Sequence, residues 1–294
     1  MSHNARVWGA LWIVYIIWGS TYLGIKVAGE TIPPVLAVAT RFIAAGAIMT
    51  SVVLFRGGSM RISRRALVSV ALIGALLPGA NAVLFIAERH IPTGIASLLI
   101  ASVPLMVVVI RLLIRERIPG WAVAGVVLGF AGVALLARPS GTATALGIGL
   151  CVLSAGMWSV GTVASARLEL PADPIAATAW EMLIGGVLLL PFGIATTHHL
   201  DPSGSSILAW IYLVTIGSVV GYTAYVWLLS NAPLSTVSTY AYVNPVVAIL
   251  LGMLFLDEHL NARILVGAAI VVVAVAVVVR NEPPAATQPE EGVR

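Results

Sequence analysis

The stretch that decides the fold reads ASVPLMVVVIRLLIRERIPGWAVAGVVLGFAGVA and covers residues 101–134. A similar stretch, AYVNPVVAILLGMLFLDEHLNARILVGAAIVVVA, covers residues 241–274. In each, a proline within an apolar run is followed by a Glu at a short charged break and then by a glycine in a second apolar run. Each stretch therefore predicts two apolar helices joined by a short polar loop, and the chain contains this pair twice.

The repeat extends from these stretches over most of the chain. Seven landmark residues recur at a nearly constant offset of about 140 residues. Two single-residue shifts are enough to keep the two copies aligned over their whole length. This self-similarity predicts two repeats, residues 1–140 and 141–280, followed by a disordered cytoplasmic tail over residues 281–294. The pairs are Trp18 and Trp158, Pro34 and Pro174, Gly46 and Gly186, Pro92 and Pro233, Pro104 and Pro245, Glu116 and Glu258, and Gly125 and Gly267.

Composition places the chain in a membrane. Of its 294 residues 60% are hydrophobic and 10% are charged, and the mean hydropathy is +1.03. Apolar runs of roughly 20 residues can cross ~30 Å of hydrocarbon as helices, and these runs are continuous rather than alternating as in a membrane barrel. We expect an all-α membrane protein with ten transmembrane helices, over residues 7–27, 34–55, 66–87, 93–114, 119–137, 145–166, 174–197, 207–229, 234–256 and 262–279.

The arginines predict the orientation. If the N-terminus lies inside, the inner segments hold ten arginines, whereas the outer segments hold three arginines and Lys26. Positive charge favours the cytoplasmic side, so both termini are expected in the cytoplasm. Five helices per repeat is an odd number, so the second repeat enters the membrane from the opposite side. The sequence therefore predicts two inverted five-helix repeats around a central cavity.

Several other classes of protein have no support in the sequence. The lone Cys151 has no disulfide partner, and no cluster of metal ligands accompanies it, so we expect neither a metal nor a cofactor. The formal charge of +4 is spread over the loops and forms no basic patch, so no nucleic-acid partner is expected. The loops leave no room for a catalytic domain and the spans hold no cluster of catalytic side chains, so an enzyme is not expected. No ATP-binding motif is present, so the energy for transport is expected to come from a gradient of substrate or ion.

Pro104 and Pro245 each lie about a dozen residues into an apolar run, near mid-bilayer. A proline inside a helix removes a backbone hydrogen bond and bends the chain. Such a bend can be a kink tolerated by helix packing. Because the two prolines occupy equivalent positions of a repeat, we favour gating residues beside a central cavity.

Aromatic and amide side chains at similar depth are candidates for a binding site. Trp18 and Trp158 lie too deep for an interfacial belt, so each needs a hydrogen-bond partner or a ligand to stack on. Tyr240 and Tyr242 point roughly 200° apart on a helix, so only one of them faces the cavity. The candidate substrate-binding residues are Trp18, Tyr22, Asn81, Trp158, Glu181, Tyr242 and Asn244, and Tyr222, Tyr225 and Tyr240 extend the set.

Arg41 and Glu181 are charged residues inside predicted spans and occupy equivalent repeat positions. Each lies seven residues past a matched proline, about 10 Å in from opposite faces, which places them too far apart for a direct ion pair. Buried charges in membranes usually face cavities or relay protons. Glu181 is therefore either a substrate or proton site or a structural carboxylate, and Arg41 either faces the cavity or extends toward the outer surface.

The motifs resemble a known family. The run Tyr15-Ile16-Ile17-Trp18-Gly19-Ser20-Thr21-Tyr22 is similar to the opening of an EamA-type domain, and so are the Pro104–Glu116–Gly125 and Pro245–Glu258–Gly267 sets. Together they cover residues 6–280 and identify a ten-helix member of the drug/metabolite transporter (DMT) superfamily, of the YddG-like and YedA-like kind. The resemblance implies an exporter of amino acids or related metabolites from the cytoplasm, which works by alternating access in the bacterial cytoplasmic membrane, and we expect it to act as a monomer. At Glu116 and Glu258 it favours helix capping over substrate binding.

We therefore expect a secondary transporter of small net-neutral metabolites, with amino acids, including aromatic ones, as the first class. The paired tryptophans, the Tyr and Asn side chains and the low charge of the spans support this class. A multidrug exporter, a nucleoside or sugar exporter of the same superfamily, and a channel are the alternatives. The small multidrug members use a carboxylate in their first helix, and the first span of this chain has no acid.

Overall fold

The computed structural model describes residues 2–136, 143–259 and 261–280, and the described chain is built from helices. The predicted disordered tail, residues 281–294, lies outside the described residues. The helices are α1 (His3–Ala28), α2 (Pro34–Phe55), α3 (Arg64–Ala87), α4 (Thr93–Ile100), α5 (Val103–Leu113), α6 (Gly120–Leu136), α7 (Ala145–Ser165), α8 (Pro174–Ala195), α9 (Gly204–Tyr212), the π-helix η1 (Leu213–Val220), α10 (Gly221–Asn231), α11 (Leu234–Val237), α12 (Tyr240–Phe255) and α13 (Ala262–Arg280).

Each predicted span coincides with helical structure in the described chain. Seven stretches are long and apolar enough to cross a membrane, among them the composite stretches Thr93–Leu113 and Gly204–Asn231. Three apolar helices are shorter: Gly120–Leu136, Tyr240–Phe255 and Ala262–Val278. The all-helical membrane architecture is therefore as predicted, and the lengths of the individual spans are less uniform than the sequence suggests.

Polar caps fix several helix starts at the ends of the molecule. The side chains of Ser2, Ser63 and Thr144 each accept a hydrogen bond from a backbone N–H in the first turn of the helix that follows. Pro34 and Pro174 begin α2 and α8, where a proline costs no hydrogen bond. These short capped ends let long apolar helices follow one another with little loop between them.

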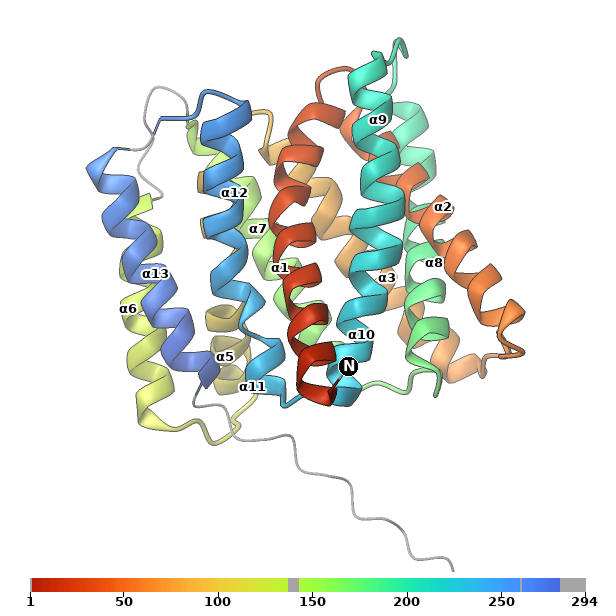
Figure 1. The fold of residues 1–294 in the computed structure, drawn as a ribbon, viewed down its shortest axis with the longest axis horizontal. Coiled ribbons are helices and arrows are strands. Elements are labelled where there is room, and N and C mark those ends of the chain that lie inside the picture. Colours follow the sequence, from red (N-terminus) through yellow and green to blue (C-terminus); the bar gives the residue numbers. More distant parts are fainter. Residues whose placement is uncertain (1, 137–142, 260, 281–294) are drawn as a thin grey trace, which may run out of the picture.

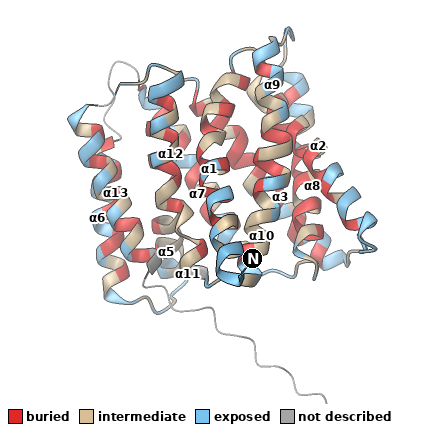
Figure 2. Cartoon of the chain, viewed as in Figure 1, coloured by how far each residue is buried: buried red, intermediate tan, exposed pale blue. Residues whose placement is uncertain are grey.

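The helices run back and forth between two ends of the molecule (Figure 1). We call the end where α1 begins the lower end and the end where α4 begins the upper end. Large apolar side chains such as Leu54, Val127 and Phe192 are exposed along the outside, whereas the interior is buried (Figure 2). An apolar exterior of this kind is suited to lipid rather than to water.

Two close helix–helix contacts involve landmark glycines of the repeat. A Cβ atom added at Gly46 in α2 would lie 2.9 Å from the backbone nitrogen of Leu183 in α8. One added at Gly186 in α8 would lie 2.9 Å from the backbone nitrogen of Ile43 in α2. Because Ile43 and Leu183 are separated by the same offset as Gly46 and Gly186, the same contact occurs twice with the roles of the helices exchanged.

The α6–α13 contact repeats the same relation. Gly125 in α6 faces Val278, and Gly267 in α13 faces Leu136. The offset between Leu136 and Val278 in the sequence equals the offset between the two glycines. Small residues allow membrane helices to approach closely, so these glycines fix how the two repeats pack together.

The two mid-membrane prolines have different places in the structure. Pro104 is the second residue of α5, directly after a break in the helix at Ala101–Ser102. Pro245 lies inside α12, and the break in its span is earlier, at Ser238–Thr239. Pro104 thus begins a helix, where its missing N–H costs nothing, while Pro245 removes a donor inside one.

Candidate functional site: a central cavity

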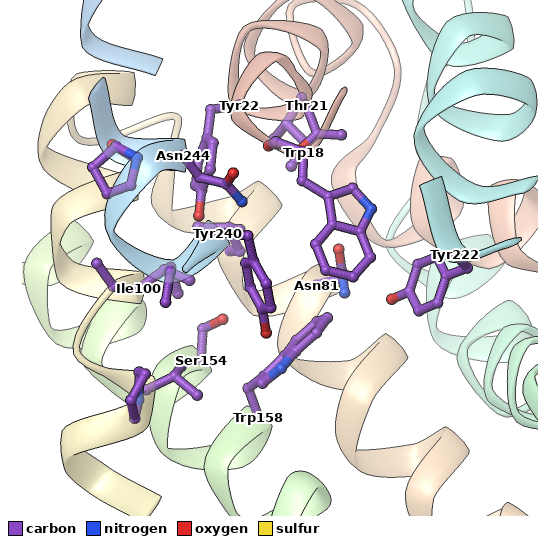
Figure 3. Close-up of a pocket in the computed structure, with 18 of the residues that line it drawn as sticks. Trp18, Thr21, Tyr22, Asn81, Ile100, Ser154, Trp158, Tyr222, Tyr240 and Asn244 are labelled. Carbon is purple, nitrogen blue, oxygen red and sulfur yellow. Dashed lines mark hydrogen bonds between the residues drawn. The ribbon is translucent and has the colours of Figure 1, made fainter. Parts of the chain in front are cut away.

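A chamber of about 110 Å³ lies in the middle of the bundle. Its walls come from α1, α2, α3, the α4–α5 break, α7, α10 and α12. Figure 3 shows side chains from both repeats around the same space. The lining residues that the sequence singled out are Trp18, Tyr22, Arg41, Asn81, Pro104, Trp158, Tyr222, Tyr240, Asn244 and Pro245.

Trp18 is the centre of an aromatic cluster in the chamber wall. Its ring centroid lies 5.2 Å from that of Tyr222, 5.0 Å from that of Tyr225 and 5.2 Å from that of Tyr240. The Trp18 and Tyr240 rings meet edge to face, with an interplanar angle of 86°, which is a favoured aromatic geometry. The cluster provides a broad, rigid apolar wall, and Trp158 of α7 adds a second indole to the same chamber.

Polar side chains make up about half of the residues that line the chamber, and several of them are held by the backbone. The Asn81 amide donates to the carbonyl of Leu77 at 3.1 Å, and Ser154 Oγ donates to the carbonyl of Ala80 at 2.8 Å. Asn244, oriented so that its amide nitrogen donates, reaches the carbonyl of Tyr15 at 3.3 Å. Backbone hydrogen bonds of this kind fix the direction of each polar side chain before any ligand enters.

A wider vestibule of about 870 Å³ leads from this chamber toward the lower end. Trp18, Trp158 and Tyr240 line both spaces, so the chamber is the inner part of one continuous cavity. Farther down, the vestibule is lined by Glu116, Arg167 and other residues at the lower ends of the helices. The cavity therefore opens toward the lower end.

Glu116 bridges two arginines beside the lower opening. Its carboxylate accepts from Arg111 Nε at 2.6 Å and from Arg167 Nη2. The hydrogen bond from Arg111 lowers the pKa of Glu116, and the bond from Arg167 lowers it further. A carboxylate with a lowered pKa keeps its ion pairs above that pKa and loses them only as the pH falls through it, so this bridge persists in mildly acidic solution.

Glu258, the repeat partner of Glu116, occupies a different environment at the upper end. Its carboxylate accepts from the backbone N–H of Thr93 at 2.6 Å, from the Thr93 hydroxyl at 2.8 Å and from the backbone N–H of Gly94 at 3.1 Å. These donors belong to the first turn of α4, so Glu258 caps a helix of the other repeat. The expected capping role thus holds for Glu258, and it ties the segment between α12 and α13 to the start of α4 at the upper end.

Glu88 shows how tightly the upper end is packed. Its side chain is buried, and neither carboxylate oxygen has a hydrogen-bond partner in the described structure. Burial raises the pKa of Glu88 well above its ordinary value, against the opposing effect of nearby Lys26. Lys26 Nζ donates to the backbone carbonyls of Glu88 and Ile91. Glu88 is therefore enclosed by protein at the upper end, with Lys26 beside it.

Replacing Glu258 with glutamine is expected to loosen the upper end. The amide turns an N–H group toward the N–H donors of α4, and losing about 1.4 kcal/mol of charge-assisted bonding makes opening about ten times more frequent. Cys151, the one cysteine of the sequence, is buried behind α4, where its thiol donates to the carbonyl of Ala96. The rate at which a maleimide alkylates Cys151 measures this opening.

The matched control is Glu169→Gln, because Glu169 is an exposed carboxylate that accepts from Ser63 at the lower end. We expect this variant to be alkylated at the wild-type rate. Equal alkylation of wild type and Glu258→Gln, with both proteins folded, would show that the cap does not hold the upper end closed.

Glu181 and Tyr242 lie outside the inner chamber. Glu181 lines the vestibule, whereas Arg41 lines the chamber and donates from Nε to Ser218 Oγ at 3.0 Å, so the two charges do not pair. The geometry puts Tyr240 in the cavity wall and leaves Tyr242 packed against the apolar core. These two tyrosines point to nearly opposite sides of α12, so only one of them can line the cavity. Tyr240 is the one on that side, where its ring contacts Tyr225 of α10.

Sequence reasoning missed Ser97, Ile100 and Ser154 in the chamber wall. Ser154 lies four residues before Trp158, one helical turn away on the same face of α7. Ser97 lies seven residues before Pro104, on the other side of the break between α4 and α5. The helical period counted from the matched Trp158 would have found Ser154, whereas the break interrupts that period before Ser97.

Comparisons with known proteins agree with this architecture. The EamA-like transporter family matches the chain twice, over residues 7–138 and 145–280. The inner membrane transporter YedA of Escherichia coli (strain K12) is 36% identical over 279 residues, which cover 92% of this chain and 90% of YedA. A chloroplastic WAT1-related protein of Arabidopsis thaliana is 29% identical, covering 91% of this chain and 68% of its own.

A solved crystal structure is also similar. It superposes with a TM-score of 0.65 at 27% sequence identity and covers 94% of this chain and 96% of its own. The structural similarity extends over both repeats, because the superposition includes nearly all of each chain.

Proposed function

The chain belongs to the EamA-like transporter family of the drug/metabolite transporter superfamily, and on that premise we propose that it is a secondary transporter exporting small metabolites. Amino acids, including aromatic ones, are the proposed substrate class. The observation that carries this proposal is the one-ended cavity, whose inner chamber joins an aromatic wall to a few fixed polar groups. The proposed substrate contacts are Trp18, Tyr22, Asn81, Trp158, Tyr240 and Asn244.

The walls of the chamber favour amino acids over the other substrates of the superfamily. The Trp18 cluster offers flat apolar surface for a side chain, and the Asn and Ser groups offer hydrogen bonds to a small polar head. A sugar needs many hydrogen bonds, whereas several of the polar side chains in the chamber already donate to backbone carbonyls. A cationic drug needs a carboxylate, and Glu181 lies outside the inner chamber, in the vestibule.

We also propose that the two repeats, residues 1–140 and 141–280, form an inverted ten-helix bundle that acts as a monomer. The exchanged glycine contacts support this arrangement, because the contact of Gly46 with Leu183 is the counterpart of the contact of Gly186 with Ile43. A twofold axis in the membrane plane relates such contacts. Helix α1 also packs against α12 as α7 packs against α4 and α5, so the first span of each repeat contacts the fourth span of the other.

The difference between the two ends supports our proposal of alternating access. The cavity opens beside Glu116 and is closed beneath Glu258, although these residues are repeat partners. In an inverted repeat, exchanging the conformations of the repeats moves the opening to the other end. We propose that the lower end faces the cytoplasm of a bacterium, in keeping with the arginines there and with the inner membrane location of YedA. Pro104 and Pro245 lie in the helices that would bend.

The test is counterflow in proteoliposomes preloaded with single unlabelled amino acids, followed by uptake of the labelled counterpart with and without a pH gradient. Robust exchange is expected for aromatic amino acids. Trp158→Ala removes the second indole of the chamber and should abolish exchange, while Glu181→Gln should retain it because Glu181 is not in the chamber. Trp8→Ala, which alters an exposed residue of α1, is the matched control and should exchange as wild type does.

Two results would contradict the proposal. Absence of exchange with every amino acid would overturn the substrate class and direct the search to nucleosides, sugars and drugs. Saturation-free flux that needs no counter-substrate would indicate a channel instead of a carrier.

A further inference from the structure

Arg41 is a buried positive charge without an acidic partner in the described structure. The residue is 3% exposed, and its Nη1 atom is buried with no hydrogen-bond partner. Its Nε atom donates to Ser218 Oγ at 3.0 Å, which is a neutral acceptor. A guanidinium carries its charge at any ordinary pH, and isolating it from water is costly unless an anion meets it.

The position of Arg41 leaves that charge facing the chamber. Arg41 lines the inner chamber together with Trp18, Thr21 and Tyr222. A Cβ atom added at Gly217 would lie 3.5 Å from Arg41 Nη2 and 3.2 Å from the Thr21 methyl. The absence of a side chain at Gly217 therefore preserves the space around the guanidinium.

The element opposite Arg41 is unusual. Gly217 and Ser218 both lie in η1, the π-helix between α9 and α10. π-Helical turns are rare, weaken the regular hydrogen-bond ladder and occur frequently at functional sites. In this chain the turn places a small residue and a hydroxyl against the guanidinium, so that Ser218 orients its Nε edge, while the ring centroid of Phe42 lies 5.1 Å from its central carbon.

We propose that Arg41 binds the carboxylate of the transported substrate, which makes it a specificity-determining residue for carboxylate-bearing solutes. The proposal rests on the transporter function proposed above and narrows its substrate class. A planar guanidinium offers two parallel N–H donors to a carboxylate. The substrate's side chain would then lie along the Trp18 cluster, which borders the same chamber. The side chains of Tyr222 and Tyr212 also lie near Arg41, and neither is a carboxylate.

The test measures equilibrium binding to the detergent-solubilised full chain by isothermal titration calorimetry, independently of transport. Three ligands are compared: phenylalanine, phenylalaninamide, which lacks the carboxylate, and 3-phenylpropionate, which lacks the ammonium. Wild type is expected to bind both carboxylates about 100-fold more tightly than the amide. Arg41→Gln should lose that preference, binding the carboxylates about 100-fold more weakly and the amide unchanged.

Two further variants sharpen the result. Arg41→Lys keeps the positive charge but loses the two parallel N–H donors of the guanidinium, so it should retain a preference of about tenfold for carboxylates over the amide. Arg56→Gln is the matched control, because Arg56 is an exposed arginine paired with Asp173 at the lower end, and its ligand preference should equal that of wild type. Unchanged binding of the amide by Arg41→Gln shows that this variant is folded.

The outcomes separate the two proposals. If Arg41→Gln keeps the preference of wild type for carboxylates, the Arg41 site is overturned while the transporter function stands. If wild type binds the amide as well as the acid, the Arg41 site is likewise overturned. If wild type binds none of the three ligands, the proposed amino-acid class fails and the Arg41 site fails with it. Displacement of bound phenylalanine by millimolar chloride would mean that Arg41 holds an inorganic anion, which also overturns the proposal.

Discussion

Trp18→Ala is expected to weaken binding of aromatic amino acids by about 100-fold and to change binding of small ones, such as alanine, by less than about fivefold. The indole contacts Tyr222, Tyr225 and Tyr240, each with ring centroids close to 5 Å apart. Its removal takes away the central surface of the wall and the support for the tyrosine rings. An aromatic ligand loses about 2–3 kcal/mol of apolar contact, whereas the methyl side chain of the ligand alanine is too short to contact this wall.

The measurement is a binding isotherm for phenylalanine and alanine with each variant. Trp18→Phe keeps an aromatic ring at the position and should recover most of the affinity for phenylalanine. Trp12→Ala is the matched control, since Trp12 lies on the exposed face of the same helix. An equal loss for phenylalanine and alanine would indicate a damaged fold or a site elsewhere, and no loss for either would remove Trp18 from the substrate path.

The repeat explains why so much of the site could be predicted from the sequence. Trp18 and Trp158, and likewise Pro104 and Pro245, are matched at nearly constant offsets, and all four line the chamber. A residue that recurs in both repeats comes close to its counterpart wherever the two repeats meet at a central cavity. Matching combined with depth in the apolar run therefore found these four residues, whereas matched residues at helix ends, such as Glu116 and Glu258, lie at opposite ends of the molecule.

What the sequence could not supply was rotation about the helix axis and local backbone irregularity. Tyr240 and Tyr242 are both plausible by depth, and only the packing of α12 against α1 and α10 turns Tyr240 to the cavity. The π-helix around Ser218 has no sequence signature, so the partner of Arg41 could not be named. Likewise, Glu116 and Glu258 look equivalent in sequence, yet one bridges arginines and the other caps α4, because the two ends of the cavity differ in conformation.

We expect most molecules of the Gly46→Leu variant to fail to fold, and we expect the same of Gly186→Leu. Even the first carbon of a new side chain at Gly46 would lie 2.9 Å from the nitrogen of Leu183 and 3.0 Å from the carbonyl oxygen of Ala179. Both atoms belong to the backbone of α8, so they cannot turn away as a side chain would. Separating α2 from α8 costs about 3 kcal/mol or more, which lowers the melting temperature by about 10 °C in a chain of this size.

The measurement is the recovery and melting temperature of each variant on fluorescence-detected size exclusion. Gly149→Leu is the matched control, because a Cβ atom at Gly149 in α7 meets nothing within 4 Å; this variant should be recovered as wild type is. Matching effects at Gly46 and Gly186 are what an inverted repeat requires, since each glycine faces the helix that carries the other. A stable Gly46→Leu beside an unstable Gly186→Leu would contradict the equivalence of the two contacts, and with it the twofold relation on which alternating access depends.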